Sequence, residues 1–223
     1  MYDNVVLIPY RNREEHLDYF INNTVPLFEK FLPNMKVVVV EQTDGKLFNR
    51  GALLNVGFKE YQNKTKYFIT HDVDYNPNEN VVRDIYSCDK IDILRIKSPH
   101  NASLGGVAKM SHSAIFNING FPNYIWGWGI EDRALYYRCL IKNIIVTENH
   151  NKNFKVMAHK SNAHQYVGEK KKISDMWKDE YISKLDENEK KALIMDSGLN
   201  NLDYSVIKRI SLHHCVELIS VDI

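Results

Sequence analysis

The chain has 223 residues, 44% of them hydrophobic, so one domain can bury a substantial core without disulfides. Its 29 lysines and arginines against 28 aspartates and glutamates give a net charge of +1, which excludes a strong overall attraction to nucleic acid or to an anionic membrane surface. The longest apolar runs are too short to cross a bilayer, and no export signal is visible. We therefore expect a single domain over residues 1–223, with no membrane segment and no nucleic-acid partner.

The first 70 residues alternate between short apolar runs and stretches with helical spacing. The runs predict buried parallel strands and the stretches predict helices between them. This βαβαβ order predicts an α/β fold with a parallel sheet. The predicted strands are 5–8, 36–40 and 67–70, and the predicted helices are 14–31, divided near Pro26, and 49–61.

The second part of the chain is less regular, and glycines concentrate between its predicted elements. A highly charged stretch over 170–191 predicts a solvated helical surface. Further strands are predicted at 91–96, 144–147 and 216–221, and helices at 111–117 and 131–142.

Three cysteines, Cys88, Cys139 and Cys215, cannot all pair, and none lies in a spacing typical of a zinc site. Their number and spacing favour a reducing compartment. We therefore expect a cytoplasmic location.

Two carboxylates follow the third predicted strand directly, in Asp72-Val73-Asp74. Ligands of open α/β sheets bind beyond the carboxyl ends of the strands. Carboxylates two residues apart can bind a divalent cation that bridges a diphosphate. The alternative is a solvated turn rich in aspartate, and the triplet alone does not decide between them.

Arginines stand at the same predicted edge. Arg11 and Arg13 follow the first strand, where guanidinium groups can pair with phosphate or a uracil carbonyl. Phe48 and Arg50 add an aromatic face and a guanidinium group at a helix start. Taken alone, these segments are compatible with an exposed basic turn and an ordinary helix start.

The segment Trp126-Gly127-Trp128-Gly129 does not suit a regular helix or strand, because glycine adds backbone freedom where burial favours rigidity. It suits a mobile loop that stacks on a sugar ring, the alternative being a tryptophan packed in a core. Glu131 and Asp132 follow at a helix start, where the helix dipole favours the ionised carboxylate that a general base needs.

Met157 and His159 are two residues apart on a predicted strand, so both side chains could reach one cation. A thioether is a soft ligand, and the spacing alone favours an ordinary core methionine.

Together, five ordered motifs resemble the β-1,4-galactosyltransferase family, glycosyltransferase family 7, over nearly the whole chain. The resemblance implies one GT-A type nucleotide-sugar-binding domain over residues 1–223, with a mainly parallel central sheet. It also implies inversion of configuration at the transferred sugar. The motifs are residues 8–17 and 48–58, the triplet Asp72-Val73-Asp74, Gly105-Gly106-Val107, and residues 119–132.

The resemblance further implies a role for each matching residue. Asp132 would be the catalytic base that takes the acceptor proton. Mn²⁺ would be ligated by Asp74, Met157 and His159, with His164 as the alternate to His159. UDP would be held by Pro9, Tyr10, Arg11, Arg13, Phe48 and Arg50, and the remaining substrate-binding positions would be Asp72, Val73, Ser103, Gly105, Gly106, Trp128 and Glu131.

Three departures from the family pattern bear on substrates and location. Arg133 replaces the usual acidic residue after the Glu-Asp pair, which leaves the carbohydrate acceptor open. Ser103 stands where galactose-specific members carry tyrosine, so we expect UDP-N-acetylgalactosamine to serve at least as well as UDP-galactose, unless Leu104 or Tyr75 fills the gap. The family's luminal anchor and cysteine framework are absent, which favours a cytoplasmic microbial or viral enzyme.

Two other functions compete with glycosyl transfer. A noncatalytic carbohydrate-binding module would need neither a base at Asp132 nor a nucleotide-binding edge. A metal-dependent phosphodiesterase would need more clustered histidine and aspartate ligands than the sequence shows.

Overall fold

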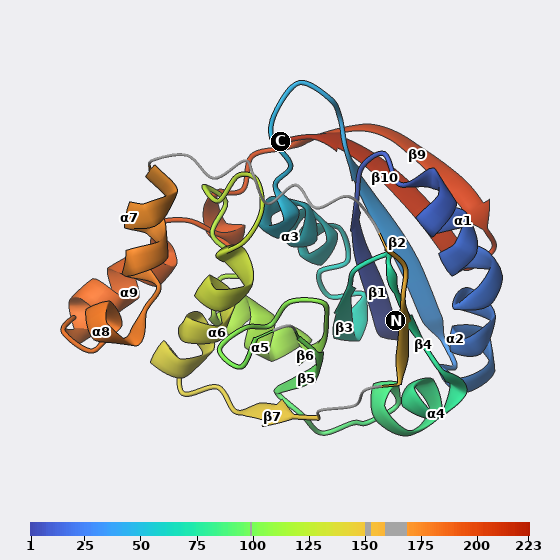
Figure 1. Cartoon of the computed structure of the whole chain (residues 1–223), viewed down its shortest axis with the longest axis horizontal. Helices are drawn as coiled ribbons and strands as arrows, with labels where there is room; N and C mark the ends of the chain where they lie inside the picture. The colour runs from blue at the N-terminus through green and yellow to red at the C-terminus, as the bar shows by residue number, and fades with distance from the viewer. Residues whose placement is uncertain (99, 150–152, 159–168) are drawn as a thin grey trace.

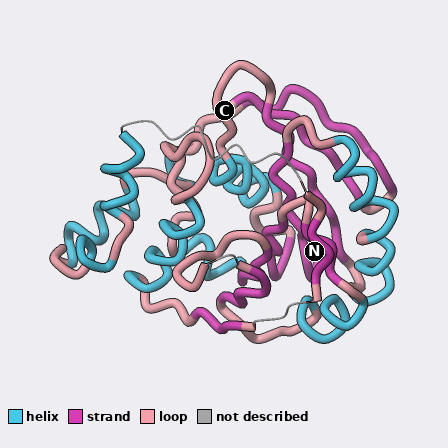
Figure 2. Tube along the Cα trace, in the orientation of Figure 1, coloured by secondary structure: helices cyan, strands magenta, loops and turns pink. Residues whose placement is uncertain are grey.

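A computed structural model describes residues 1–98, 100–149, 153–158 and 169–223. Within these ranges a sheet with the strand order β7-β5-β6-β3-β1-β2-β10-β9 runs through the molecule, with helices on both sides (Figures 1 and 2). Its centre is parallel, as predicted: β1 pairs with β2 and β3, and β2 pairs with β10. These four strands are β1 (Tyr2–Tyr10), β2 (Met35–Gln42), β3 (Thr65–His71) and β10 (Val216–Asp222).

The outer strands make the sheet mixed. β6 lies antiparallel to both β3 and β5, β5 is parallel to β7, and β9 is antiparallel to β10. The sequence did not predict β6 or β9. The outer strands are β5 (Ile93–Lys97), β6 (Val107–Ser111), β7 (Val146–Glu148) and β9 (Ser205–His213), and a separate small sheet pairs β4 (Tyr75–Pro77) with β8 (Phe154–Val156).

Each face of the sheet has its own buried core, because successive residues of the central strands point to opposite faces. Val6 and Val37 pack under α1 (Glu14–Asn23), α2 (Val25–Phe31), the short α4 (Glu79–Val81) and the π-helical turn η1 (Val82–Tyr86). Leu7 and Val38 pack under α3 (Arg50–Glu60), α5 (His112–Asn117) and α6 (Glu131–Ile141).

The division expected near Pro26 falls at Thr24, between α1 and α2. Pro26 then lies in the first turn of α2, where its missing N–H leaves no helical hydrogen bond unmade. No helix in the described ranges is both long and apolar enough to span a membrane.

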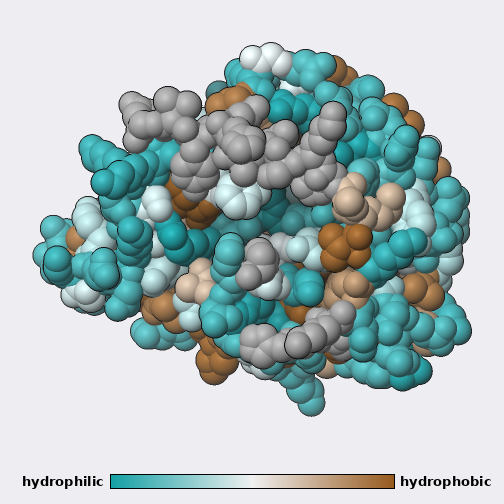
Figure 3. All heavy atoms as spheres, in the orientation of Figure 1, coloured by the Kyte–Doolittle hydropathy of each residue, from teal (hydrophilic) through white to brown (hydrophobic). Residues whose placement is uncertain are grey.

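The prediction of a solvated helical surface over 170–191 is correct about the helices but wrong about Trp177, which is buried. This stretch folds into α7 (Glu169–Met176), α8 (Asp179–Ile182) and most of α9 (Glu187–Met195), which form a lobe beside α6 at the left of Figure 1. Trp177, between α7 and α8, is fully buried against Ile130 and Ala134. The lobe therefore has an apolar centre of its own beneath a surface that is largely hydrophilic, at the left of Figure 3. The short helical turn η2 (Leu199–Asn201) leads from it to β9.

Candidate active site

Three elements bring the predicted base, Asp132, together with two predicted substrate-binding residues, Arg50 and Asp72. Asp72 follows β3, Arg50 begins α3, and Asp132 lies in the first turn of α6. The Arg50 guanidinium contacts Asp72 Oδ1 through Nη2 at 2.8 Å and Asp132 Oδ1 through Nη1 at 2.5 Å. The Arg50 side chain is 11% exposed, so both ion pairs are largely shielded from water. Residues 50, 72 and 132 thus form one charged cluster at the carboxyl edge of the parallel strands.

Local structure fixes the two helix starts. The Asn49 side chain caps α3 by accepting a hydrogen bond from Ala52 N at 3.0 Å. Before α6, Gly127, Gly129 and Ile130 all have left-handed backbone angles, which confirms the irregular conformation expected of the tryptophan loop. Gly127 N donates to Phe48 O at 2.7 Å, so the loop is attached to the residue before Asn49.

The paired glycines leave space beside Asp132. A Cβ atom on Gly105 would lie 2.2 Å from Asp132 Oδ2, inside the contact distance of any real side chain. Gly106 has a φ of +70°, and a Cβ there would lie 2.5 Å from Lys97 O. Gly106 O also accepts from Asp72 N at 3.0 Å. The Asp132 carboxylate therefore occupies the space that a side chain at position 105 would fill, and the backbone of Gly106 holds the backbone of Asp72.

Burial sets the electrostatics of the two carboxylates on α6. It raises the pKa of Asp132 above the usual range, and Arg50 opposes this rise. Burial also raises the pKa of Glu131, and the neighbouring Asp132 adds to it. Glu131 Oε2 has no hydrogen-bond partner among the described residues. Both pKa values are raised chiefly because burial disfavours the charged form of a carboxylate.

The predicted nucleotide-binding residues lie at the same edge. Arg11 places its guanidinium 5.3 Å from the Phe48 ring centre and donates to Lys46 O at 2.7 Å. Tyr10 Oη accepts from Arg13 N at 3.3 Å, which closes the turn after β1. Pro9 is buried within β1, one residue before Tyr10. Four of the six positions assigned to UDP therefore border one another, Arg50 lies in the charged cluster, and Pro9 supports the turn from the strand.

The predicted metal ligands are only partly described. Met157 N donates to Asp74 O at 3.0 Å, so the chain carrying Met157 passes directly beside Asp74. His159 and its alternate His164 lie outside the described residues. The Val73 side chain is buried in the core, which leaves only its backbone for a substrate.

The remaining predicted positions surround the cluster. Ser103 is buried, and its hydroxyl accepts from Gly105 N at 3.2 Å. Trp128 is 54% exposed, and its carbonyl accepts from Lys170 Nζ at 2.8 Å. Exposure of this extent does not suit the alternative of a core tryptophan. Arg133 donates through Nη2 to Ser174 Oγ at 2.6 Å, which ties α6 to α7.

Sequence reasoning missed His71, which is fully buried beneath this edge. Its Nδ1 contacts Asp72 O at 2.8 Å, and its Nε2 contacts Tyr86 Oη at 2.9 Å. A carbonyl oxygen only accepts, so Nδ1 carries the proton and Nε2 accepts from tyrosine. Burial lowers the pKa of His71 to about 4, which keeps the ring neutral. His71 therefore anchors the residue that pairs with Arg50.

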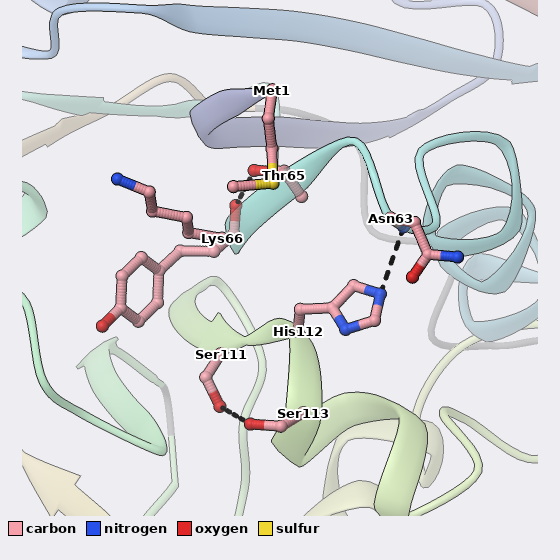
Figure 4. Close-up of a pocket in the computed structure, with 8 residues that line it drawn as sticks. Met1, Asn63, Thr65, Lys66, Ser111, His112 and Ser113 are labelled. Atoms are coloured by element: carbon pink, nitrogen blue, oxygen red, sulfur yellow. Dashed lines mark hydrogen bonds between the residues drawn. The ribbon is translucent and has the colours of Figure 1, made fainter.

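A pocket of about 630 Å³ lies elsewhere, at the amino end of β3. Thr65, Lys66 and His112 line it, and Figure 4 shows His112 beside Asn63. Asn63 N donates to His112 Nε2 at 3.2 Å. None of the predicted site residues borders this pocket, because it is at the opposite edge of the sheet from Asp72.

Comparison with known sequences identifies the family to which the chain is similar. A family described as the N-terminal region of glycosyl transferase group 7 matches residues 1–89, and one described as the N-terminal domain of galactosyltransferase matches residues 88–160. β-1,4-Galactosyltransferase 6 of Mus musculus is 33% identical over 213 residues, covering 90% of this chain and 52% of the relative. β-1,4-Galactosyltransferase 1 of Bos taurus is 30% identical over 213 residues, covering 91% of this chain and 50% of the relative.

Comparison with solved structures supports the fold. The catalytic domain of Drosophila β-1,4-galactosyltransferase 7, in complex with xylobiose, superposes with a TM-score of 0.80 at 22% identity, covering all of this chain and 94% of that one. A variant of that protein, in complex with manganese, UDP-Gal and xylobiose, gives a TM-score of 0.79. This confirms the GT-A type fold. The chain spans about half the length of the curated relatives it matches, and it belongs to glycosyltransferase family 7, the β-1,4-galactosyltransferase family.

Proposed function

We propose that this chain is an inverting, Mn²⁺-dependent glycosyltransferase that moves galactose or N-acetylgalactosamine from a UDP-sugar to a hydroxyl of a carbohydrate acceptor. The observation that carries the proposal is the position of Asp132. It lies at a helix start, paired with Arg50 and next to the space left by Gly105. Family membership and the Drosophila complex with UDP-Gal support the same chemistry.

In this mechanism Asp132 accepts the proton of the acceptor hydroxyl while the oxygen bonds to the anomeric carbon and the bond from that carbon to UDP breaks. A single displacement of this kind inverts the anomeric centre. Arg50 holds Asp132 and Asp72 in place through its two ion pairs. Arg11 and Phe48 bind the nucleotide, and the exposed ring of Trp128 covers the donor and excludes water.

Mn²⁺ is held in this proposal by Asp74, Met157 and His159. The hydrogen bond from Met157 N to Asp74 O supports this assignment, because the two residues lie side by side. A carboxylate with an imidazole suits manganese better than calcium, which prefers oxygen ligands alone. When bound, the ion neutralises the charge that develops on the departing diphosphate.

In this proposal Ser103 determines which donor sugar is accepted. Its small side chain and its hydrogen bond to Gly105 N place it beside the glycine that faces Asp132. We propose that UDP-N-acetylgalactosamine is used at least as well as UDP-galactose. Competition between the two donors at equal concentration measures this preference, and a strong preference for UDP-galactose would contradict it.

The test of the proposed function is UDP release from each UDP-sugar, with Mn²⁺, in the presence and absence of a panel of simple glycosides. A transferase releases UDP faster when an acceptor is present and forms a new glycoside. A binding module releases none, and a phosphodiesterase cleaves the donor without an acceptor. Loss of the acceptor-dependent signal in excess EDTA, and its recovery with Mn²⁺, tests the metal requirement.

A further inference from the structure

A cluster of potential metal ligands lies at the other edge of the sheet. His213 ends β9, His214 and Cys215 form the turn into β10, and Glu29 lies on α2. Val216, the next residue, pairs with Val37 near the start of β2, whereas Asp72 follows the end of β3. The turn of the β9–β10 hairpin therefore lies beside α2 at the right of Figure 1, away from the candidate active site.

The four donor atoms converge. All lie within 4.8 Å of one another. Cys215 Sγ is 3.3 Å from His213 Nδ1 and 3.4 Å from Glu29 Oε1. Glu29 Oε1 is also 3.8 Å from His213 Nδ1 and 2.8 Å from His214 Nε2.

Most of these separations suit a tetrahedral zinc site. Bonds of about 2.0 to 2.1 Å to nitrogen or oxygen and about 2.3 Å to sulfur place ligand atoms roughly 3.3 to 3.7 Å apart. Three of the four separations above lie in or within 0.1 Å of that range. The separation between His214 and Glu29 is that of a direct hydrogen bond, and it must widen by roughly half an ångström. The His214 side chain is 75% exposed, so it is free to move by that amount.

We propose that Glu29, His213, His214 and Cys215 bind one Zn²⁺ ion. A thiolate with two imidazoles selects zinc over the hard Mn²⁺ ion of the proposed active site. The negative charges of Cys215 and Glu29 together balance the two charges of the ion. Four protein ligands leave no open position for water, which is the arrangement of a structural site and not of a catalytic one. This inference does not depend on the proposed function.

Metal binding at this site would affect the stability of the fold. β9 is an edge strand that is exposed along most of its length, so the hairpin has few buried contacts on its outer side. A metal held by Glu29 and by the hairpin turn would link segments 186 residues apart in the chain. Zinc binding should therefore stabilise the native state, because the unfolded chain lacks the assembled site.

Titration of chelator-treated protein with Co²⁺ tests the proposal. Co²⁺ bound to a thiolate gives an intense charge-transfer band in the near ultraviolet, and no cysteine is among the ligands proposed for the Mn²⁺ site. We expect this band to reach its limit at one equivalent of Co²⁺ and to disappear when Zn²⁺ is added. It should be absent in Cys215→Ser and unchanged in Cys88→Ser, the matched control.

A second measurement, the effect of Zn²⁺ on Tm, keeps the proposal testable even if the cysteine variant misfolds. His214→Ala changes an exposed side chain, so the protein should fold normally while binding Zn²⁺ more weakly. We expect Zn²⁺ to raise the Tm of the wild type and of Cys88→Ser, and to raise it less in His214→Ala. A folded wild type without the band, or a band that persists in Cys215→Ser, would overturn the proposal. Transfer activity with Mn²⁺ should be unaffected by either substitution, so the result is separable from the proposed function.

Discussion

Arg50 couples the two carboxylates of the candidate site. Its guanidinium lies between Asp72 and Asp132 and pairs with both, so a cation from a third element joins the two carboxylates. The two carboxylates together raise the pKa of Arg50 in spite of its burial. The resemblance assigns Arg50 to UDP, and the structure adds a role in positioning the proposed base.

Replacing Arg50 should move the acid limb of the pH profile. Asp132 must be ionised to accept a proton, so activity falls as the pH drops through its pKa. Arg50 lowers that pKa, and Arg50→Met should therefore raise it and shift the acid limb of kcat/KM to higher pH, by about 1 to 3 pH units. Arg209→Met removes an arginine that pairs with Glu60 and Glu217, and it should leave the limb unchanged. An unshifted limb in Arg50→Met would show that this cation does not control the base.

The absence of a side chain at Gly105 lets Asp132 keep its orientation. A Cβ at position 105 meets the carboxylate of Asp132 and not backbone, so the fold can accommodate alanine if that side chain rotates away. We expect Gly105→Ala to retain a near-normal Tm while kcat falls on the order of a hundredfold, because a displaced base loses most of its contribution. Steady-state kinetics and thermal unfolding of the same preparation separate the two effects. A large loss of Tm with unchanged kcat would mean that Gly105 serves the fold alone.

At the scale of elements, α6 is held by an unusual buried cation. Arg138 donates through Nη1 to Gly120 O at 2.8 Å and through Nη2 to Ser197 O at 2.5 Å. Its guanidinium carbon lies 5.6 Å from the Trp177 ring centre. These contacts join the helix that starts at Glu131 to the loop before it and to the lobe of α7–α9. The orientation of Asp132 thus depends on packing more than one helical turn away.

The two tryptophans of this region should behave differently when removed. Trp177→Ala deletes a fully buried ring, and we expect it to lower the free energy of unfolding by about 3 to 5 kcal/mol in urea titrations. Trp128→Ala shortens a residue that is 54% exposed, and it should cost less than about 1 kcal/mol while reducing transfer. Equal losses of stability would contradict the view that Trp177 organises the lobe.

The elements that sequence patterns predicted are those with a clear buried face. The runs at 5–8 and 36–40 became β1 and β2, because central strands of a sandwiched sheet are apolar on both faces. β9 was missed because nearly every residue of this edge strand is exposed, so burial imposes no alternation. The lobe was misjudged because one buried tryptophan, Trp177, lies among many charged residues.

At the scale of the whole molecule, the pH dependence of stability involves His71, a buried neutral histidine beneath the sheet edge where the candidate site lies. His71 packs edge-on against Phe20 and Phe28 and is fully excluded from solvent. Its folded-state pKa of about 4 lies below the usual 6.5, so between these values the unfolded chain binds a proton that the native chain does not. The free energy of unfolding must therefore fall as the pH decreases through this window.

We expect His71 to contribute about 3 kcal/mol of destabilisation between pH 6.5 and pH 4, from about 1.4 kcal/mol for each unit by which the two pKa values differ. Urea unfolding at several pH values measures the slope. His71→Gln should remove this component, whereas His100→Gln, at an exposed position, should keep it. A slope in His71→Gln equal to that of the wild type would assign the pH dependence to other groups.

Contacts across the whole molecule explain what the sequence could not show. Asp132, Asp72 and Arg50 each stood out as members of local motifs. Their meeting in one cluster joins residues 82 positions apart, which no local pattern encodes. The sequence did not reveal the proposed zinc ligands, because His213, His214 and Cys215 are contiguous and do not have a spacing typical of zinc sites. Their fourth partner, Glu29, comes from a distant helix.

The account depends most on Asp132 as the proton acceptor, and one variant tests this directly. Asp132→Asn preserves the size and most hydrogen-bonding geometry of the side chain but cannot serve as a base at neutral pH. We expect it to bind UDP and Mn²⁺ as the wild type does, measured by calorimetry, and to lose acceptor-dependent transfer on the order of a hundredfold or more. Near-normal turnover in Asp132→Asn, with its nucleotide binding intact, would contradict the assignment of the base.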